Sequence, residues 1–223
     1  MPQRTPPRPH GHHAARQQGS RLQQRRRIAL EAARLISEHG LRDYHRAKLR
    51  AAERLGVRDD QVLPRNDEID AALREHQRLF QSDTQPAALQ ARRLAAVTAM
   101  QFLARFQPRL VGPVLEGTAD QHSPVCLHLY SDIPAAVAQF LAERGVPCET
   151  RQRQLRMDRL HELAAEVLLF HADGIAFDLT VLPLDALRQA PLDASGQRAL
   201  RRASLSTLQA LLPEDAPAQR PAD

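Results

Sequence analysis

The sequence predicts an α+β protein, in which a helical N-terminal half is followed by a small α/β domain with a mixed sheet. Two observations predict it. Up to about residue 107 the apolar residues recur at helical spacings of three and four, whereas after Pro108 they form short runs between Pro, Gly and Asp. With 223 residues, 43% of them hydrophobic, the chain is long enough to bury a core.

The N-terminal end is basic and poor in apolar residues. Residues 1–20 contain four prolines and show no apolar period, so they are expected to form a disordered tail. Residues 1–30 hold seven arginines and no acid, a charge of +7, and the whole chain carries +5, so the remainder carries −2. The basic character therefore belongs to the tail, which weakens the case for nucleic-acid binding by the rest of the chain.

Four helices are expected in the helical region, residues 21–107. The first ends at Gly40 and the second at Gly56, because glycine commonly terminates a helix. The third begins at Asn66, whose side chain is expected to cap it, and the fourth begins at Pro86, a favoured residue of the first helical turn. Their apolar faces carry Ile28, Ala32, Leu35, Ile36, Tyr44, Ala47, Ala51, Leu55, Ile69, Leu73, Phe80, Leu89, Ala96, Met100 and Leu103.

The α/β domain is expected at residues 108–212. Apolar runs predict strands at 110–115, 125–130, 166–171 and 175–182, and residues 147–150 add a short strand. Helices are expected at 132–144 and 199–212. A second disordered tail is expected at 213–223.

Several classes of protein find no support in the sequence. No run of 18 apolar residues and no secretory leader is found, so a cytoplasmic protein without a membrane partner is expected. The two cysteines, Cys126 and Cys148, are too few for a disulfide framework and are expected to be buried free thiols. Neither a P-loop nor a G-x-S-x-G nucleophile motif is present.

The segment LVGPVLEGTADQHSPVCLHL, residues 110–129, holds the candidate nucleotide-binding residues. Glycine allows the backbone to approach a phosphate, and hydroxyl groups can donate to it. The candidates are Gly112, Gly117, Thr118 and Ser123. Arg201 and Arg202 are a further candidate pair for phosphate or nucleic acid, because guanidinium groups bind phosphate oxygens bidentately.

Residues 109–183 resemble the core of the DNA-polymerase-β-type nucleotidyltransferase superfamily, as a degenerate member of a divergent bacterial branch. In that pattern a strand ends in Gly-Ser, Gly-Thr follows, Ser-Asp-x-Asp opens the next strand, and a later strand carries a third carboxylate. The matching residues are Gly112, Gly117, Thr118, Ser123 and, as the third carboxylate, Asp178. The departures are Pro113, Pro124 and Cys126, of which the last two replace the paired carboxylates.

The resemblance implies a mixed sheet with flanking helices and the transfer of a nucleoside monophosphate to a hydroxyl group. That chemistry uses two divalent metal ions held by three carboxylates. Proline has no ligand atom and a thiol is a poor ligand for Mg²⁺, so Asp178 would remain alone. We therefore expect no metal-dependent transfer and no cofactor, with Mg²⁺ required only by an active enzyme, and at most binding of a nucleotide or RNA or a regulatory role.

Three alternatives stay open at this stage. The first is an active but atypical nucleotidyltransferase. The second is a helical DNA-binding regulator, because ALEAARLISEHGLRDY resembles the first helix of a TetR-like repressor, although the segment after it lacks a compact recognition helix. The third is a zinc site formed by Cys126, His128 and Asp178, against which packed or hydrogen-bonded side chains are the simpler interpretation. The sequence specifies no protein partner.

Overall fold

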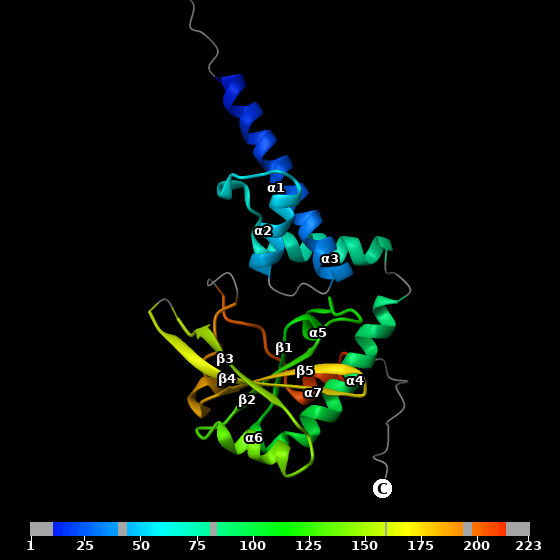
Figure 1. Cartoon of the computed structure of the whole chain (residues 1–223), viewed down its shortest axis with the longest axis vertical. Helices are drawn as coiled ribbons and strands as arrows, with labels where there is room; N and C mark the ends of the chain where they lie inside the picture. The colour runs from blue at the N-terminus through cyan, green and yellow to red at the C-terminus, as the bar shows by residue number, and fades with distance from the viewer. Residues whose placement is uncertain (1–10, 40–43, 81–83, 159, 194–197, 213–223) are drawn as a thin grey trace, which may run out of the picture. The chain divides into compact units, whose positions relative to one another are not determined.

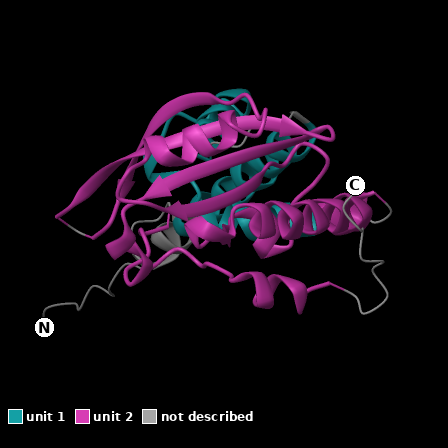
Figure 2. Cartoon of the chain, turned by 90° about the horizontal axis from the view of Figure 1, so that it is seen from below, with its two compact units in different colours: residues 1–76 teal, residues 77–223 magenta. Residues whose placement is uncertain are grey.

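A computed structural model of the chain describes residues 11–39, 44–80, 84–158, 160–193 and 198–212, with the backbone alone for 11–17 and 39 (Figure 1). The chain divides into two compact units, residues 1–76 and 77–223 (Figure 2). The boundary expected from the sequence lay at residues 107 and 108. It falls earlier because the fourth helix packs into the core of the second unit rather than with the other helices.

The first unit is helical. It contains α1 (Gly11–His39), α2 (Tyr44–Arg54), the short helix η1 (Asp60–Val62) and most of α3 (Asn66–Phe80). Alanine is prominent where these helices meet, and such small side chains let helix backbones approach closely. Gly56 terminates α2 in the left-handed conformation, at φ +67°, as the sequence predicts. The buried apolar residues are Ile28, Ala29, Ala32, Ala33, Leu35, Ile36, Ala47, Ala51, Ala52, Val62, Ile69, Ala72 and Leu73.

One prediction for the N-terminal segment is wrong. Residues 11–20, expected to be disordered, form the first turns of α1. The prolines end at Pro9, and the alanines, arginines and glutamines that follow favour helix, although Gly11 and Gly19 do not. The expectations for residues 1–10 and 213–223 lie outside the described residues.

The second unit contains a five-stranded mixed sheet, which confirms the predicted fold class. Its strands are β1 (Arg109–Val111), β2 (Val125–Tyr130), β3 (Glu149–Arg156), β4 (Glu162–Ala172) and β5 (Ile175–Leu182), in the order β1-β2-β5-β4-β3. Strands β2 and β5 are parallel, and the other neighbours are antiparallel. The boundaries of β2 and β5 are those expected from their apolar runs.

Helices of the second unit pack on both faces of this sheet. Those on the face of the main core are α4 (Gln85–Phe102), η2 (Ala104–Phe106), α5 (Pro113–Glu116), α6 (Ala135–Ala142) and α7 (Leu205–Gln209). The short helix η3 (Leu184–Leu187) lies on the opposite face, where Ala186 packs with Tyr130 and Leu182. Side chains from α4, α6 and α7 pack on the same face of β2 and β5. Because alternate residues of a strand face opposite sides, the other face carries the intervening residues of β2 and β5. The main core includes Ala96, Met100, Leu103, Phe106, Leu127, Leu129, Val137, Phe140, Leu141, Leu168, Leu179, Val181 and Leu208.

Four expected elements differ most from the structure, the first being the strand expected at 166–171, which begins at Glu162 as β4. The strand expected at 110–115 stops at Val111, because Gly112 (φ +70°, ψ −153°) turns the chain and Pro113 begins α5. The helix expected at 199–212 is confined to Leu205–Gln209, since Ala203 pairs with Leu110 at the sheet edge instead. The short strand expected at 147–150 continues to residue 156 as β3.

Candidate functional site

Polar side chains gather on the sheet face opposite the main core. Cys126 and His128 of β2 are the parallel partners of Asp178 and Thr180 of β5. Partners in register project to the same face, so these four side chains form one polar group. His128 and Thr180 are buried, whereas Cys126 and Asp178 are half-buried.

Gly112 lies directly beside this group. A Cβ atom placed on Gly112 would be 3.7 Å from Cβ and 3.8 Å from Sγ of Cys126. Cys126 in turn is in register with Asp178. The fold therefore brings together the first glycine of the sequence motif, the position of a missing carboxylate, and the one carboxylate that is present.

Asp178 is engaged by an arginine that the sequence analysis did not single out. Arg153 on β3 reaches across β4 and binds the carboxylate bidentately, with Nη2 2.7 Å from Oδ2 and Nη1 3.1 Å from Oδ1. Its Nη1 also donates to the Thr180 hydroxyl at 3.1 Å. The hydrogen bond to Asp178 raises the pKa of Arg153, against the opposing effect of its partial burial. The side chain of Asp178 is only 15% exposed, so this pair is partly shielded from water.

The residues of this face do not fit a magnesium pair. The positions of the paired carboxylates hold a proline and a half-buried thiol, Pro124 and Cys126, and both oxygens of Asp178 accept hydrogen bonds from Arg153. A fixed positive charge therefore stands where a metal ion would be needed. Within the described part of the chain, no group of three or more His, Cys, Asp or Glu side chains could hold a metal, so the zinc alternative gains no support either.

His128 is the most perturbed titratable group of the face. Burial, with the Arg202 guanidinium as a second cause, lowers its pKa to about 4, and Asp178 only partly opposes the two. The ring is therefore neutral near pH 7. Its Nδ1 atom is buried and has no hydrogen-bond partner among the described residues. His128 thus contributes an unsatisfied polar atom rather than a charge.

The glycine loop between α5 and β2 is held by side chains from α4. Arg92 donates from Nε to the Ser123 carbonyl oxygen at 2.7 Å and from Nη2 to that of Gln121 at 2.5 Å. The Gln85 amide donates to the carbonyl oxygens of residues 117 and 119, at 3.0 and 2.9 Å. Gly117 ends α5 with φ +80°, a conformation that glycine adopts without strain. Hydrogen bonds from α4 therefore hold the loop in one conformation.

Of the two candidate hydroxyl groups of this loop, one is hydrogen-bonded within the loop and the other is buried. Ser123 Oγ donates to Asp120 Oδ1 and accepts from the Asp120 backbone N–H, both at 3.0 Å. Thr118 is buried, and its Oγ1 atom has no partner among the described residues. Neither hydroxyl is presented to a phosphate as the sequence interpretation supposes.

The two candidate arginines near the C-terminus have different surroundings. Arg202 donates from Nη1 to the Tyr130 hydroxyl at 2.7 Å and to the Ala186 carbonyl oxygen at 2.8 Å, and from Nη2 to that of Leu187 at 3.2 Å. It thereby ties η3 to the end of β2. Arg201 is exposed. The guanidinium group of Arg202 is therefore already hydrogen-bonded within the fold, whereas that of Arg201 faces solvent.

Comparison with known proteins adds no assignment. No protein-family model matches the chain, and no curated protein is similar to it. In the described residues, no helix has both the length and the apolar character needed to cross a membrane.

Proposed function

We propose that residues 77–223 are a catalytically silent domain of the DNA-polymerase-β-type nucleotidyltransferase fold, acting by binding rather than by nucleotide transfer. The observation that carries this proposal is the bidentate pair between Arg153 and Asp178. An arginine bound to both oxygens of the remaining carboxylate is incompatible with that carboxylate holding a metal ion.

The placement of three residues supports kinship with that superfamily. The resemblance requires the first glycine, the paired carboxylate positions and the third carboxylate to meet on adjacent strands. Gly112 lies against Cys126, and Cys126 is in register with Asp178 across the parallel strands β2 and β5. Residues 66 positions apart in the chain have no local reason to meet in this way.

The same residues explain the loss of transfer. Two Mg²⁺ ions bring four positive charges, and a site with one carboxylate cannot offset them. Here even that carboxylate is neutralised by Arg153, and the neighbouring His128 and Arg202 supply no negative charge. The electrostatics of the face therefore oppose metal binding.

The ligand class that we propose for this domain is a nucleotide or an RNA phosphate, bound weakly and without Mg²⁺. Gly112 leaves the backbone beside Cys126 uncovered by a side chain. Weak binding is expected because Thr118 is buried and the Ser123 hydroxyl is already engaged by Asp120. A regulatory role follows from binding without turnover.

Two measurements on the full chain test the proposal. In the first, purified protein is incubated with labelled nucleoside triphosphates, an RNA acceptor and Mg²⁺ or Mn²⁺, and we expect no incorporation. Incorporation that disappears in Asp178→Ala would overturn the proposal. In the second, nucleotide is titrated with and without Mg²⁺, and we expect equal affinity. Tighter binding with Mg²⁺ would show that the site does hold a metal, with Arg188→Ala, at an exposed position of the same unit, as the control for non-specific attraction to positive charge.

A further inference from the structure

The net positive charge of the chain lies in the first unit. Residues 1–76 contain 16 Lys and Arg against 10 Asp and Glu, a net charge of +6, and residues 77–223 contain 15 against 16, a net charge of −1. The first acid of the chain is Glu31. The strongest positive region is therefore the N-terminal part of α1, outside residues 77–223.

This part of α1 extends beyond the helical core of its unit (Figure 1). Every residue from 18 to 27 is exposed, apart from the half-buried Arg25, and the first buried side chain that the structure describes is Ile28. Ten residues of helix span about 15 Å. The exposed segment has arginines at 21, 25, 26 and 27 and a single apolar residue, Leu22.

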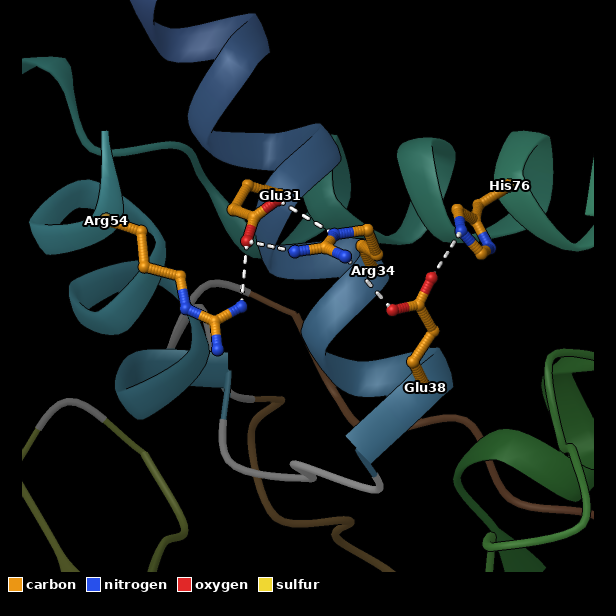
Figure 3. Close-up of polar contacts among 5 residues, drawn as sticks. All are labelled: Glu31, Arg34, Glu38, Arg54 and His76. Carbon is orange, nitrogen blue, oxygen red and sulfur yellow. Dashed lines mark hydrogen bonds and ion pairs between the residues drawn. The ribbon is translucent and has the colours of Figure 1, made fainter.

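Two arginines further along the unit form ion pairs with acidic side chains, whereas those of the segment do not. Arg34 binds Glu31 and Glu38 at 3.0 and 3.2 Å, and Arg54 binds Glu31 at 3.0 Å (Figure 3). None of the ion pairs found among the described residues includes an arginine of the segment. The segment therefore presents uncompensated positive charge to solvent.

A surface hollow adjoins the segment. It has a volume of about 250 Å³ and is lined by Gln24, Arg27, Leu55, Gly56, Val57, Arg58 and Asp59. Two arginines reach it, from α1 and from the loop after α2. Its one acid is already engaged, because the Asp59 carboxylate caps η1 by accepting from the Gln61 N–H at 2.9 Å. The hollow is large enough for a phosphate group, which is only a few water molecules in size.

The distribution of arginines around the helix indicates which class of molecule the segment can bind. Successive residues of an α-helix point about 100° apart, so Arg25, Arg26 and Arg27 face three different sides. With Leu22 as its one apolar residue, the segment has no stripe with which to bind a protein helix. Positive charge on several sides suits a helix flanked by phosphate backbones. The major groove of B-form DNA, about 12 Å wide, admits an α-helix, whereas that of A-form RNA is too narrow.

We propose that residues 18–27 of α1, together with Arg58, form a binding surface for the phosphate backbone of double-stranded DNA. Arg21, Arg26 and Arg27 contact phosphates on both sides of the groove, and Arg58 holds a phosphate at the hollow. Contacts of this kind position a protein on DNA without selecting a base sequence. The inference goes beyond the proposed function, because it uses none of the residues of the α/β unit.

Fluorescence anisotropy with the full chain tests this surface. The probe is a labelled DNA duplex of about two helical turns, with the RNA duplex and the single DNA strand of the same sequence for comparison, at salt between about 50 and 200 mM. The variant Arg26→Gln/Arg27→Gln removes two charges and keeps good helix formers. Its matched control, Arg188→Gln/Arg198→Gln, removes two charges from exposed positions of the second unit.

We expect the wild-type chain to bind the DNA duplex more tightly than the RNA duplex or the single strand. The Arg26/Arg27 variant should bind the DNA duplex about tenfold more weakly at low salt, and the slope of its affinity against salt should fall by about 1.8, for two lost phosphate contacts. Arg58→Gln should reduce the slope by about half that amount. Equal affinities of the Arg26/Arg27 variant and the control, or tighter binding to the RNA duplex, would overturn the proposal. Either result would leave unaffected the proposal that the α/β unit does not catalyse nucleotide transfer.

Discussion

Removing Arg153 should cost more stability than removing its partner Asp178. The Asp178 side chain is 15% exposed and that of Arg153 is 44% exposed. In Arg153→Gln the carboxylate stays shielded from water with its main partner gone, whereas in Asp178→Asn the long arginine can turn its guanidinium to solvent. Breaking a fully buried pair costs about 3–5 kcal/mol, and an exposed pair is worth about 0.2–1 kcal/mol. For this partly exposed pair we expect about 2 kcal/mol for Arg153→Gln and about 1 kcal/mol for Asp178→Asn.

The assay can be made specific to the second unit. The chain has no tryptophan and two tyrosines, Tyr44 in the first unit and Tyr130 in the second. In a Tyr44→Phe background, the fluorescence of Tyr130 reports the unfolding of the α/β unit alone. With a urea dependence of about 1–3 kcal/mol per M, Arg153→Gln should lower the midpoint of unfolding by about 1 M.

The double variant Arg153→Gln/Asp178→Asn gives the matching control. It removes the shielded carboxylate that Arg153→Gln leaves without its main partner, so it should be more stable than the two separate losses predict. The reasoning is refuted if Asp178→Asn costs as much as Arg153→Gln, or if the double variant is no more stable than the sum of the two losses predicts.

Two further predictions concern neighbouring residues. Because the pKa of His128 is lowered to about 4, mainly by burial, the unfolded chain takes up this proton at higher pH than the folded chain. The free energy of unfolding should therefore fall by up to about 3 kcal/mol between pH 6.5 and 4. Urea titrations of His128→Phe should lack this part of the loss, and an unchanged pH dependence would count against a buried neutral ring. Gly112→Ala has room for its methyl group but must adopt φ +70° and ψ −153°, a region that is almost restricted to glycine, so thermal or urea unfolding should show a loss of about 1–3 kcal/mol. Gly19→Ala, within α1 and without a positive φ, should instead gain up to about 1 kcal/mol, and a gain at Gly112 as well would contradict the backbone argument.

The strands that were predicted well are those whose apolar pattern is strong. Residues 125–130 and 175–182 have buried apolar side chains along most of their length, and their boundaries match the structure. Gly112 and Asp178, which the sequence analysis placed in one motif, lie on either side of Cys126 in the structure. The sequence was therefore sufficient to predict these strands, because the burial of apolar side chains decides their structure.

The features that were missed depend on contacts between distant segments. Strand β3 reads Glu-Thr-Arg-Gln-Arg-Gln-Leu-Arg, with nearly every side chain exposed, so no alternation of apolar residues indicates it. It is a strand because β4 pairs with it along its whole length. Arg153 therefore gave no local sign of its role. Arg92 lies on the apolar face of α4, three residues after Leu89 and four before Ala96, but its charge gave no sign of burial. It is buried because carbonyl oxygens of the loop at 121–123 accept hydrogen bonds from its guanidinium.

The two edges of the sheet have consequences for how the protein behaves in concentrated solution. A strand edge with free N–H and C=O groups can recruit a second chain and start an aggregate. At one edge, β1 is three residues long and Leu110 exchanges two 2.9 Å hydrogen bonds with Ala203. At the other edge, β3 carries arginines at 151, 153 and 156, each in an ion pair with a carboxylate, so a second copy pairing with this edge would have to displace water from these charged groups. The guanidinium that neutralises Asp178 thus belongs to a strand that also discourages intermolecular sheet growth.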